Sequence, residues 1–223
     1  MATVKESNNL TEEALDKFDI NLLHDSLAKC CTDNDSLDME QYLIAFRELY
    51  RFFSLLGSVF GFVASDILSK VGILDDYLRS SSHYSTVQSM VEHEVSTSTT
   101  AVATRPSGAR TLLRLHRSLE FISSFMEEFG TAESAAKSST IAQKCYKDTL
   151  ARYHPWLVQK GAGIAMYTLP SKKHFIEKVK GEPCDDQQVE YYGKMMADIA
   201  QASRRVYDVT QKLYEANDLL DLP

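Results

Sequence analysis

The sequence has few of the residues that interrupt helices. Only five prolines and nine glycines are spread over 223 residues, and long stretches contain neither. Apolar residues recur with helical spacing, and the clean alternation typical of half-buried strands is hard to find. This pattern predicts an all-α fold without a sheet.

Other features are missing too, and each excludes a class of protein. Lys and Arg number 24 against 31 Asp and Glu, and the resulting net charge of −7 argues against nucleic-acid binding. The longest apolar stretch, residues 52–64, is too short to span a bilayer. The four cysteines have neither zinc spacing nor a disulfide framework, which favours a reducing compartment. The N-terminus also lacks an apolar signal core, so we expect a cytoplasmic protein.

Signatures of catalysis are likewise absent. The sequence contains no GxSxG, no HExxH and no glycine-rich phosphate loop. We therefore expect a protein that is not an enzyme and that uses neither a cofactor nor a metal.

The helical periodicity divides the chain into a series of segments without an internal repeat or a second domain. Residues 1–223 are predicted to form a single domain, with residues 1–9 flexible. The second and third predicted helices can also be one continuous or kinked helix, which gives about eight in total. Helices are predicted near residues 11–32, 38–51, 52–77, 83–96, 108–129, 138–152, 155–168, 171–180 and 186–217.

The helix predicted at 108–129 has an unusual distribution of charge. At about 100° per residue, one side of this helix carries two cations and then two aromatic rings. They are Arg110, Arg114, Phe121 and Phe125. Such a stripe suits a ligand with a charged head and an apolar tail. The alternative is a solvated basic turn, in which Arg117 pairs with Glu120 three residues on.

The stretch 52–74 shows a second anomaly. If it forms one helix, six apolar side chains share a face: Phe52, Leu55, Val59, Phe62, Val63 and Ile73. Asp66 and Lys70 fall in the middle of that face. Small residues, Gly57 and Gly61 among them, occupy another side and suit close contact between helices. Charges on an apolar face are costly unless they are paired and hydrogen-bonded, so they are candidates for a recognition site. The alternative is a surface ion pair of little consequence.

A third element is the segment YHPWLVQK, residues 153–160. His154 precedes Pro155 at a predicted helix start, where a histidine can simply cap or pack. Trp156 is the only tryptophan and can lie either in the core or at a membrane interface.

These elements together resemble the glycolipid-transfer-protein family. The resemblance rests on SDILSK, RTLLRLHR, YHPW, TLP and the ending TQKLYEANDLLDLP, and it covers about residues 38–223. It implies a two-layer helical sandwich that admits a lipid between its layers. In the glycolipid-selective branch, a tryptophan that stacks on sugar stands where this sequence has Arg114. The departure implies ceramide 1-phosphate as the ligand, because a guanidinium suits phosphate oxygens.

The resemblance also implies a role for each residue of the head-group site. Asp66 would accept a hydrogen bond from the ceramide amide, and His154 would donate one to its carbonyl. The phosphate would be held by Lys70, Arg110 and Arg114. Candidates for the apolar pocket, taken from the sequence pattern, are Phe52, Leu55, Val59, Phe62, Phe121 and Phe125.

The function expected from the resemblance is non-vesicular transfer of ceramide 1-phosphate between membranes by a monomer. Three alternatives stay open: a sphingolipid-responsive adaptor without bulk transfer, an enzyme acting on a phospholipid head group, and a plain helical scaffold.

For transient membrane contact, Trp156 is expected to insert shallowly while Lys172 and Lys173 meet phosphate head groups. The alternative places Trp156 in the core and these lysines on a solvated face. The resemblance suggests Golgi, endosomal or plasma membranes.

Overall fold

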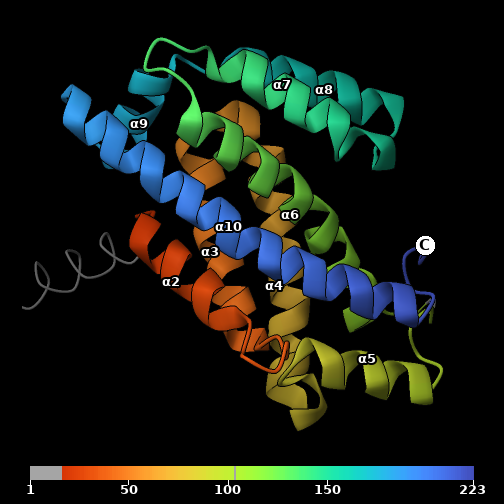
Figure 1. Cartoon of the computed structure of the whole chain (residues 1–223). Coiled ribbons are helices and arrows are strands. Elements are labelled where there is room, and N and C mark those ends of the chain that lie inside the picture. The colour runs from red at the N-terminus through yellow and green to blue at the C-terminus, as the bar shows by residue number, and fades with distance from the viewer. Residues whose placement is uncertain (1–16, 103) are drawn as a thin grey trace, which may run out of the picture.

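The computed structural model describes residues 17–102 and 104–223, and all regular secondary structure within these ranges is helical (Figure 1). The all-α prediction is confirmed. The described residues form nine α-helices and three short 3-10 helices rather than the predicted eight or so. The α-helices are α2 (Ile20–Cys30), α3 (Met39–Leu55), α4 (Gly61–Ser80), α5 (Val87–Ser96), α6 (Gly108–Thr131), α7 (Ser138–Asp148), α8 (Trp156–Tyr167), α9 (Lys172–Lys180) and α10 (Asp186–Ala216). The 3-10 helices are η1 (Ser58–Phe60), η2 (Ser82–Tyr84) and η3 (Ala151–Tyr153).

The boundary predicted between residues 51 and 52 was wrong, and so was the idea of one continuous helix. Helix α3 runs on to Leu55, and the chain then turns through Gly57 and η1 before α4 begins. Gly57 has a φ of +105°, a backbone conformation that side-chain-bearing residues rarely adopt. The apolar face expected on residues 52–74 is therefore divided between two helices.

The helix predicted at residues 11–32 begins later than expected. Helix α2 begins at Ile20 because the Asp19 side chain accepts hydrogen bonds from the backbone N–H groups of Asn21 and Leu22 and caps the first turn. Residues 17–19 are not helical. The remainder of the predicted start, and the segment 1–9 expected to be flexible, lie outside the described residues.

The helices form two layers, as predicted. Helices α2, α10, α6 and α7 lie side by side in one layer, and α3, α4 and α8 lie behind them (Figure 1). Helices α6 and α10 make the most extensive pairing. They cross so closely that a Cβ added to Gly130 would lie 2.6 Å from the carbonyl oxygen of Gly193. None of the helices in the described ranges is both long enough and apolar enough to pass through a bilayer.

Helix α6 is held at both ends by buried charged side chains. At its N-terminus, the Glu94 carboxylate accepts hydrogen bonds from the backbone N–H groups of Gly108 (2.6 Å) and Ala109 (2.9 Å). At its C-terminus, Lys172 Nζ donates to the carbonyl oxygens of Gly130 (2.8 Å) and Ala132 (2.6 Å). Each charge has the sign that complements the helix dipole and satisfies groups that lack a partner within the helix. These contacts fix α6 as the helix that positions the site.

Candidate functional site

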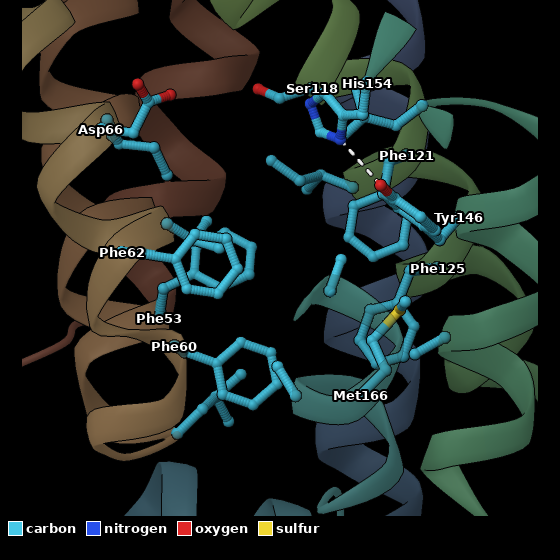
Figure 2. Close-up of a pocket in the computed structure, with 18 of the residues that line it drawn as sticks. Phe53, Phe60, Phe62, Asp66, Ser118, Phe121, Phe125, Tyr146, His154 and Met166 are labelled. Atoms are coloured by element: carbon cyan, nitrogen blue, oxygen red, sulfur yellow. Dashed lines mark hydrogen bonds between the residues drawn. The ribbon is translucent and has the colours of Figure 1, made fainter. Parts of the chain in front are cut away.

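A cavity of about 510 Å³ lies between the two layers. Its walls come from α3 and α4 on one side and from α6, α7 and α8 on the other (Figure 2). Most of the lining is aromatic or aliphatic, and the polar side chains gather at one end. Figure 2 shows Asp66, Ser118 and His154 at that end, with Phe60 and Met166 at the opposite end. A mainly apolar cavity with a few convergent polar groups is typical of a ligand site.

Asp66 and Lys70 form an ion pair at the polar end, both on α4 and one turn apart. The Lys70 side chain is only 17% exposed, whereas that of Asp66 is 65% exposed. Both line the cavity. The pair is thus neither fully buried nor a plain surface contact, but stands where the cavity opens to solvent.

The cations of α6 are hydrogen-bonded to backbone oxygens and not to Asp or Glu side chains. Arg114 donates to the carbonyl oxygens of Arg110 (2.8 Å) and Pro223, and Arg117 donates to that of Leu220 at 2.6 Å. The pKa of Arg114 is lowered, first by burial and then by the neighbouring Arg110 and Arg117, with Asp66 opposing the change. Three guanidiniums thus lie close together at this end of α6.

The alternative pairing of Arg117 with Glu120 is wrong. Glu120 accepts a hydrogen bond from Arg152 at 2.8 Å, and the Arg117 guanidinium lies over the ring of Tyr153. Across residues 17–102 and 104–223, none of the three arginines at this end of α6 forms an ion pair with an Asp or Glu side chain. Arg114 and Arg117 line the cavity, but Arg110, although predicted for the site, does not.

His154 reaches the cavity from the turn before α8, and its ring is held by a residue that the sequence did not reveal. The Tyr146 hydroxyl lies 2.8 Å from His154 Nδ1 (Figure 2). Burial lowers the pKa of His154 and raises that of Tyr146, which favours a neutral imidazole beside a protonated phenol. When the phenol donates to Nδ1, the imidazole proton is on Nε2. Nothing in the local sequence pattern linked the two residues.

Four of the six apolar candidates line the cavity: Phe52, Phe62, Phe121 and Phe125. Leu55 and Val59 do not, because the break between α3 and α4 turns them away, and Val59 is exposed. Further aromatic residues, from the region of the break and from α7, η3 and α9, also line the cavity. The additional aromatic lining consists of Phe53, Phe60, Tyr146, Tyr153 and Phe175.

The lysines expected to touch membranes are not beside Trp156. The Lys172 residue is only 4% exposed and caps α6, so its expected docking role is wrong. Lys173 lies 3.5 Å from Asp186. Both lysines follow the C-terminal end of α8, whereas Trp156 begins that helix.

Trp156 does not lie in the core. It is 69% exposed, and its neighbours on the outer side of α8 are exposed as well: Leu157, Ile164 and Tyr167. The inner side of the same helix lines the cavity with Val158, Ala162 and Met166. Helix α8 is therefore apolar both toward the cavity and toward solvent, which an ordinary surface helix is not.

Comparison of the sequence with known proteins points to a family of lipid-transfer proteins. The model of the family described as glycolipid transfer protein matches residues 37–181. A ceramide-1-phosphate transfer protein of Xenopus tropicalis is 36% identical over 220 residues, which cover 96% of this chain and 99% of that protein. The protein of the same name from Rattus norvegicus is 38% identical over 215 residues, covering 92% and 97%.

Two solved structures have the same arrangement of helices. The mouse ceramide-1-phosphate transfer protein without ligand has a TM-score of 0.83 and 36% identity, and covers 93% of this chain and 100% of that one. The human protein in complex with 2:0 ceramide 1-phosphate has a TM-score of 0.82 and 33% identity over the same shares.

Proposed function

The chain belongs to the glycolipid transfer protein family, and we propose that it carries ceramide 1-phosphate between membranes and releases the lipid chemically unchanged. One observation in particular supports a phosphate-bearing ligand. In the described residues, a group of arginines without Asp or Glu partners stands at the polar end of an apolar cavity. A phosphate monoester brings roughly −1.5 to −2 charges near neutral pH, which is what this end of the cavity lacks.

Each polar side chain has a separate task in this proposal. Lys70, Arg110 and Arg114 bind the phosphate, and Arg114 is best placed because it lines the cavity. Asp66 accepts a hydrogen bond from the ceramide amide N–H, and His154 donates from Nε2 to the amide carbonyl. The exposure of Asp66 at the opening is consistent with an amide that lies just below the head group.

The division between head and tail also allows release. Moving a CH₂ group out of water is favourable by about 0.8 kcal/mol. A lipid that leaves a bilayer for the cavity, however, exchanges one apolar environment for another. The chains therefore set little preference between protein and membrane, and contacts to the head group determine which lipid is selected. The free energy of the lipid is therefore similar in the protein and in the membrane, so the lipid can leave at the acceptor membrane.

The test is transfer of fluorescent ceramide 1-phosphate between donor and acceptor vesicles by the wild type and by Arg114→Leu. Loss of a charge-assisted contact of about 1.5–3 kcal/mol should slow transfer by about tenfold or more. The matched control is Arg79→Leu, which removes the same charge from an exposed position on α4 outside the cavity. Transfer by Arg114→Leu at the rate of this control would contradict the proposal.

The same assay separates the alternatives. Tight lipid binding without transfer would indicate a sphingolipid-responsive adaptor instead of a carrier. Chemical change of the recovered lipid would indicate an enzyme.

We further propose a cytoplasmic monomer that touches membranes transiently through the outer side of α8, since Trp156 and its exposed apolar neighbours lie beside the cavity wall.

A further inference from the structure

The segment that follows α10 turns back on itself and ends against the cationic end of the cavity. We call residues 217–223 the C-terminal hook. Helix α10 ends at Ala216, and Asp218 takes a φ of +55°, a left-handed conformation that Asp and Asn tolerate better than most residues. The backbone N–H of Leu219 then donates to the carbonyl oxygen of Tyr214 at 3.0 Å.

Leucine side chains anchor the hook to the protein. Leu219 is only 4% exposed, and Leu220 and Leu222 are partly buried against the core. The anchoring means that the backbone of the hook has a defined position relative to α6.

Two arginines that line the cavity, Arg114 and Arg117, donate hydrogen bonds to this backbone. The Leu220 carbonyl oxygen accepts a hydrogen bond from Arg117 Nη2 at 2.6 Å, and the Pro223 carbonyl oxygen accepts one from Arg114 Nη2. Arg114 Nη1 is oriented by a third carbonyl, that of Arg110, at 2.8 Å. The carbonyl oxygens of Arg110 and Leu220 are neutral, so they orient the two guanidiniums without compensating their positive charge.

The arginines also keep donors for a ligand. A guanidinium has five N–H groups, and the bonds described here use two on Arg114 and one on Arg117. The Arg117 guanidinium is in addition stacked over the Tyr153 ring, 4.2 Å from its centroid. Both side chains are therefore directed toward the cavity before any anion arrives.

We propose that the C-terminal hook is a positioning element of the head-group site: its carbonyl oxygens hold Arg114 and Arg117 together so that they can bind phosphate. This inference rests on the proposed function. Adjacent guanidiniums repel each other, and long side chains lose rotamer freedom when they bind. Hydrogen-bond acceptors on an anchored backbone fix both side chains before the ligand arrives, which is how preorganisation increases affinity. The effect is specific for ligands that carry a phosphate.

The test loosens the hook without changing charge or chain length. The variant is Leu220→Gly/Leu222→Gly, which removes two anchoring side chains and leaves every carbonyl in place. The matched control is Val209→Ala/Leu213→Ala, which removes partly buried apolar groups from α10 away from the cavity. Equilibrium titration measures the affinity of each protein for a water-soluble short-chain ceramide 1-phosphate and for the unphosphorylated ceramide of the same chain length.

We expect the affinity of the hook variant to fall about tenfold for the phosphate-bearing ligand and less than about twofold for ceramide. The tenfold loss corresponds to roughly 1.4 kcal/mol of binding free energy, which the fixed arginines contribute at the phosphate alone. The control should keep the wild-type ratio of the two affinities. In an Arg114→Leu/Arg117→Leu background, loosening the hook should have almost no further effect, since the groups that it orients are gone.

Three results would overturn the inference. The hook variant could keep the wild-type affinity ratio, or lose affinity for both ligands equally, which would mark a purely structural segment. It could instead bind the phosphate ligand more tightly, which would mean that the hook competes with the ligand. A wild type that fails to prefer the phosphate-bearing lipid at all would refute the proposed function itself, so the two failures are distinguishable.

Discussion

His154 shows how a single side chain becomes available to a ligand through its neighbours. The residue before a proline is restricted to extended conformations, and His154, preceding Pro155, has φ −106° and ψ 137°. Helix α8 begins two residues later, at Trp156, so the imidazole stays outside the helix. The Tyr146 hydroxyl is hydrogen-bonded to Nδ1, which leaves Nε2 of this cavity-lining residue available to a ligand.

Tyr146→Phe removes the hydroxyl that sets the orientation and tautomer of His154. We expect the affinity for ceramide 1-phosphate and for ceramide to fall equally, by about fivefold, because one hydrogen bond of about 1 kcal/mol is lost from the amide end rather than from the phosphate. Equilibrium titration with both short-chain lipids measures the effect. Tyr167→Phe, at an exposed position, serves as the control. A fall confined to the phosphate-bearing lipid would show that His154 does not serve the amide.

The sequence predicted the polar side chains of the site better than its apolar wall. Each predicted polar residue stood out locally, as a charge on an apolar helix face or as a histidine before proline. The structure brings four of them to one cavity: Asp66, Lys70, Arg114 and His154. Tyr146 did not stand out, since its partner comes from a turn whose path depends on tertiary packing. The same limit applies to the carbonyls of the C-terminal hook, which are backbone atoms without any side-chain signature.

At the scale of elements, most helices lie where periodicity placed them, and the break after α3 shows where periodicity fails. Gly57 and Gly61 were interpreted as part of a small-residue side suited to close helix contact. A Cβ at either glycine would meet nothing within 4 Å, and Gly57 instead supplies the positive φ of the turn. The true close crossing, between Gly130 and Gly193, joins residues far apart in the sequence and could not be predicted locally.

Helix α6 gives a prediction about stability. Lys172→Met keeps the volume of the side chain but leaves the carbonyl oxygens of Gly130 and Ala132 without their donor. We expect the free energy of unfolding to fall by about 1–3 kcal/mol, the cost of leaving buried acceptors unpaired. Chemical denaturation measures it.

Lys173→Met is the matched control, because its side chain is 39% exposed and its pairing with Asp186 is a surface contact. Its stability should stay within roughly 0.5 kcal/mol of the wild type. If Lys172→Met were as stable as this control but bound vesicles more weakly, the original docking role of Lys172 would be correct and the capping role wrong.

At the scale of the whole molecule, net charge and exposed surface bear on how the protein meets a membrane. A net charge of −7 makes long-range attraction to an anionic bilayer unfavourable. The lysines of α9 do not form the compensating patch that the sequence suggested, since Lys172 is buried and Lys173 pairs with Asp186. What remains on the outer side of α8 is apolar surface, with Lys160 lying 5.6 Å from the centre of the Trp156 ring.

The proposed docking surface therefore works through apolar insertion more than through charge. Trp156→Ala/Leu157→Ala should weaken binding to phosphatidylcholine vesicles and slow transfer by about tenfold, because insertion of such side chains contributes about 1.5–3 kcal/mol each when complete. Thermal stability should hardly change, since both residues are exposed. The control is Tyr191→Ala, an exposed residue on α10 instead of α8.

Raising the salt concentration should leave vesicle binding by the wild type nearly unchanged, whereas a charge-driven contact would weaken as its field is screened. Strong salt dependence, or normal transfer by the double variant, would place the membrane contact on another face of the molecule.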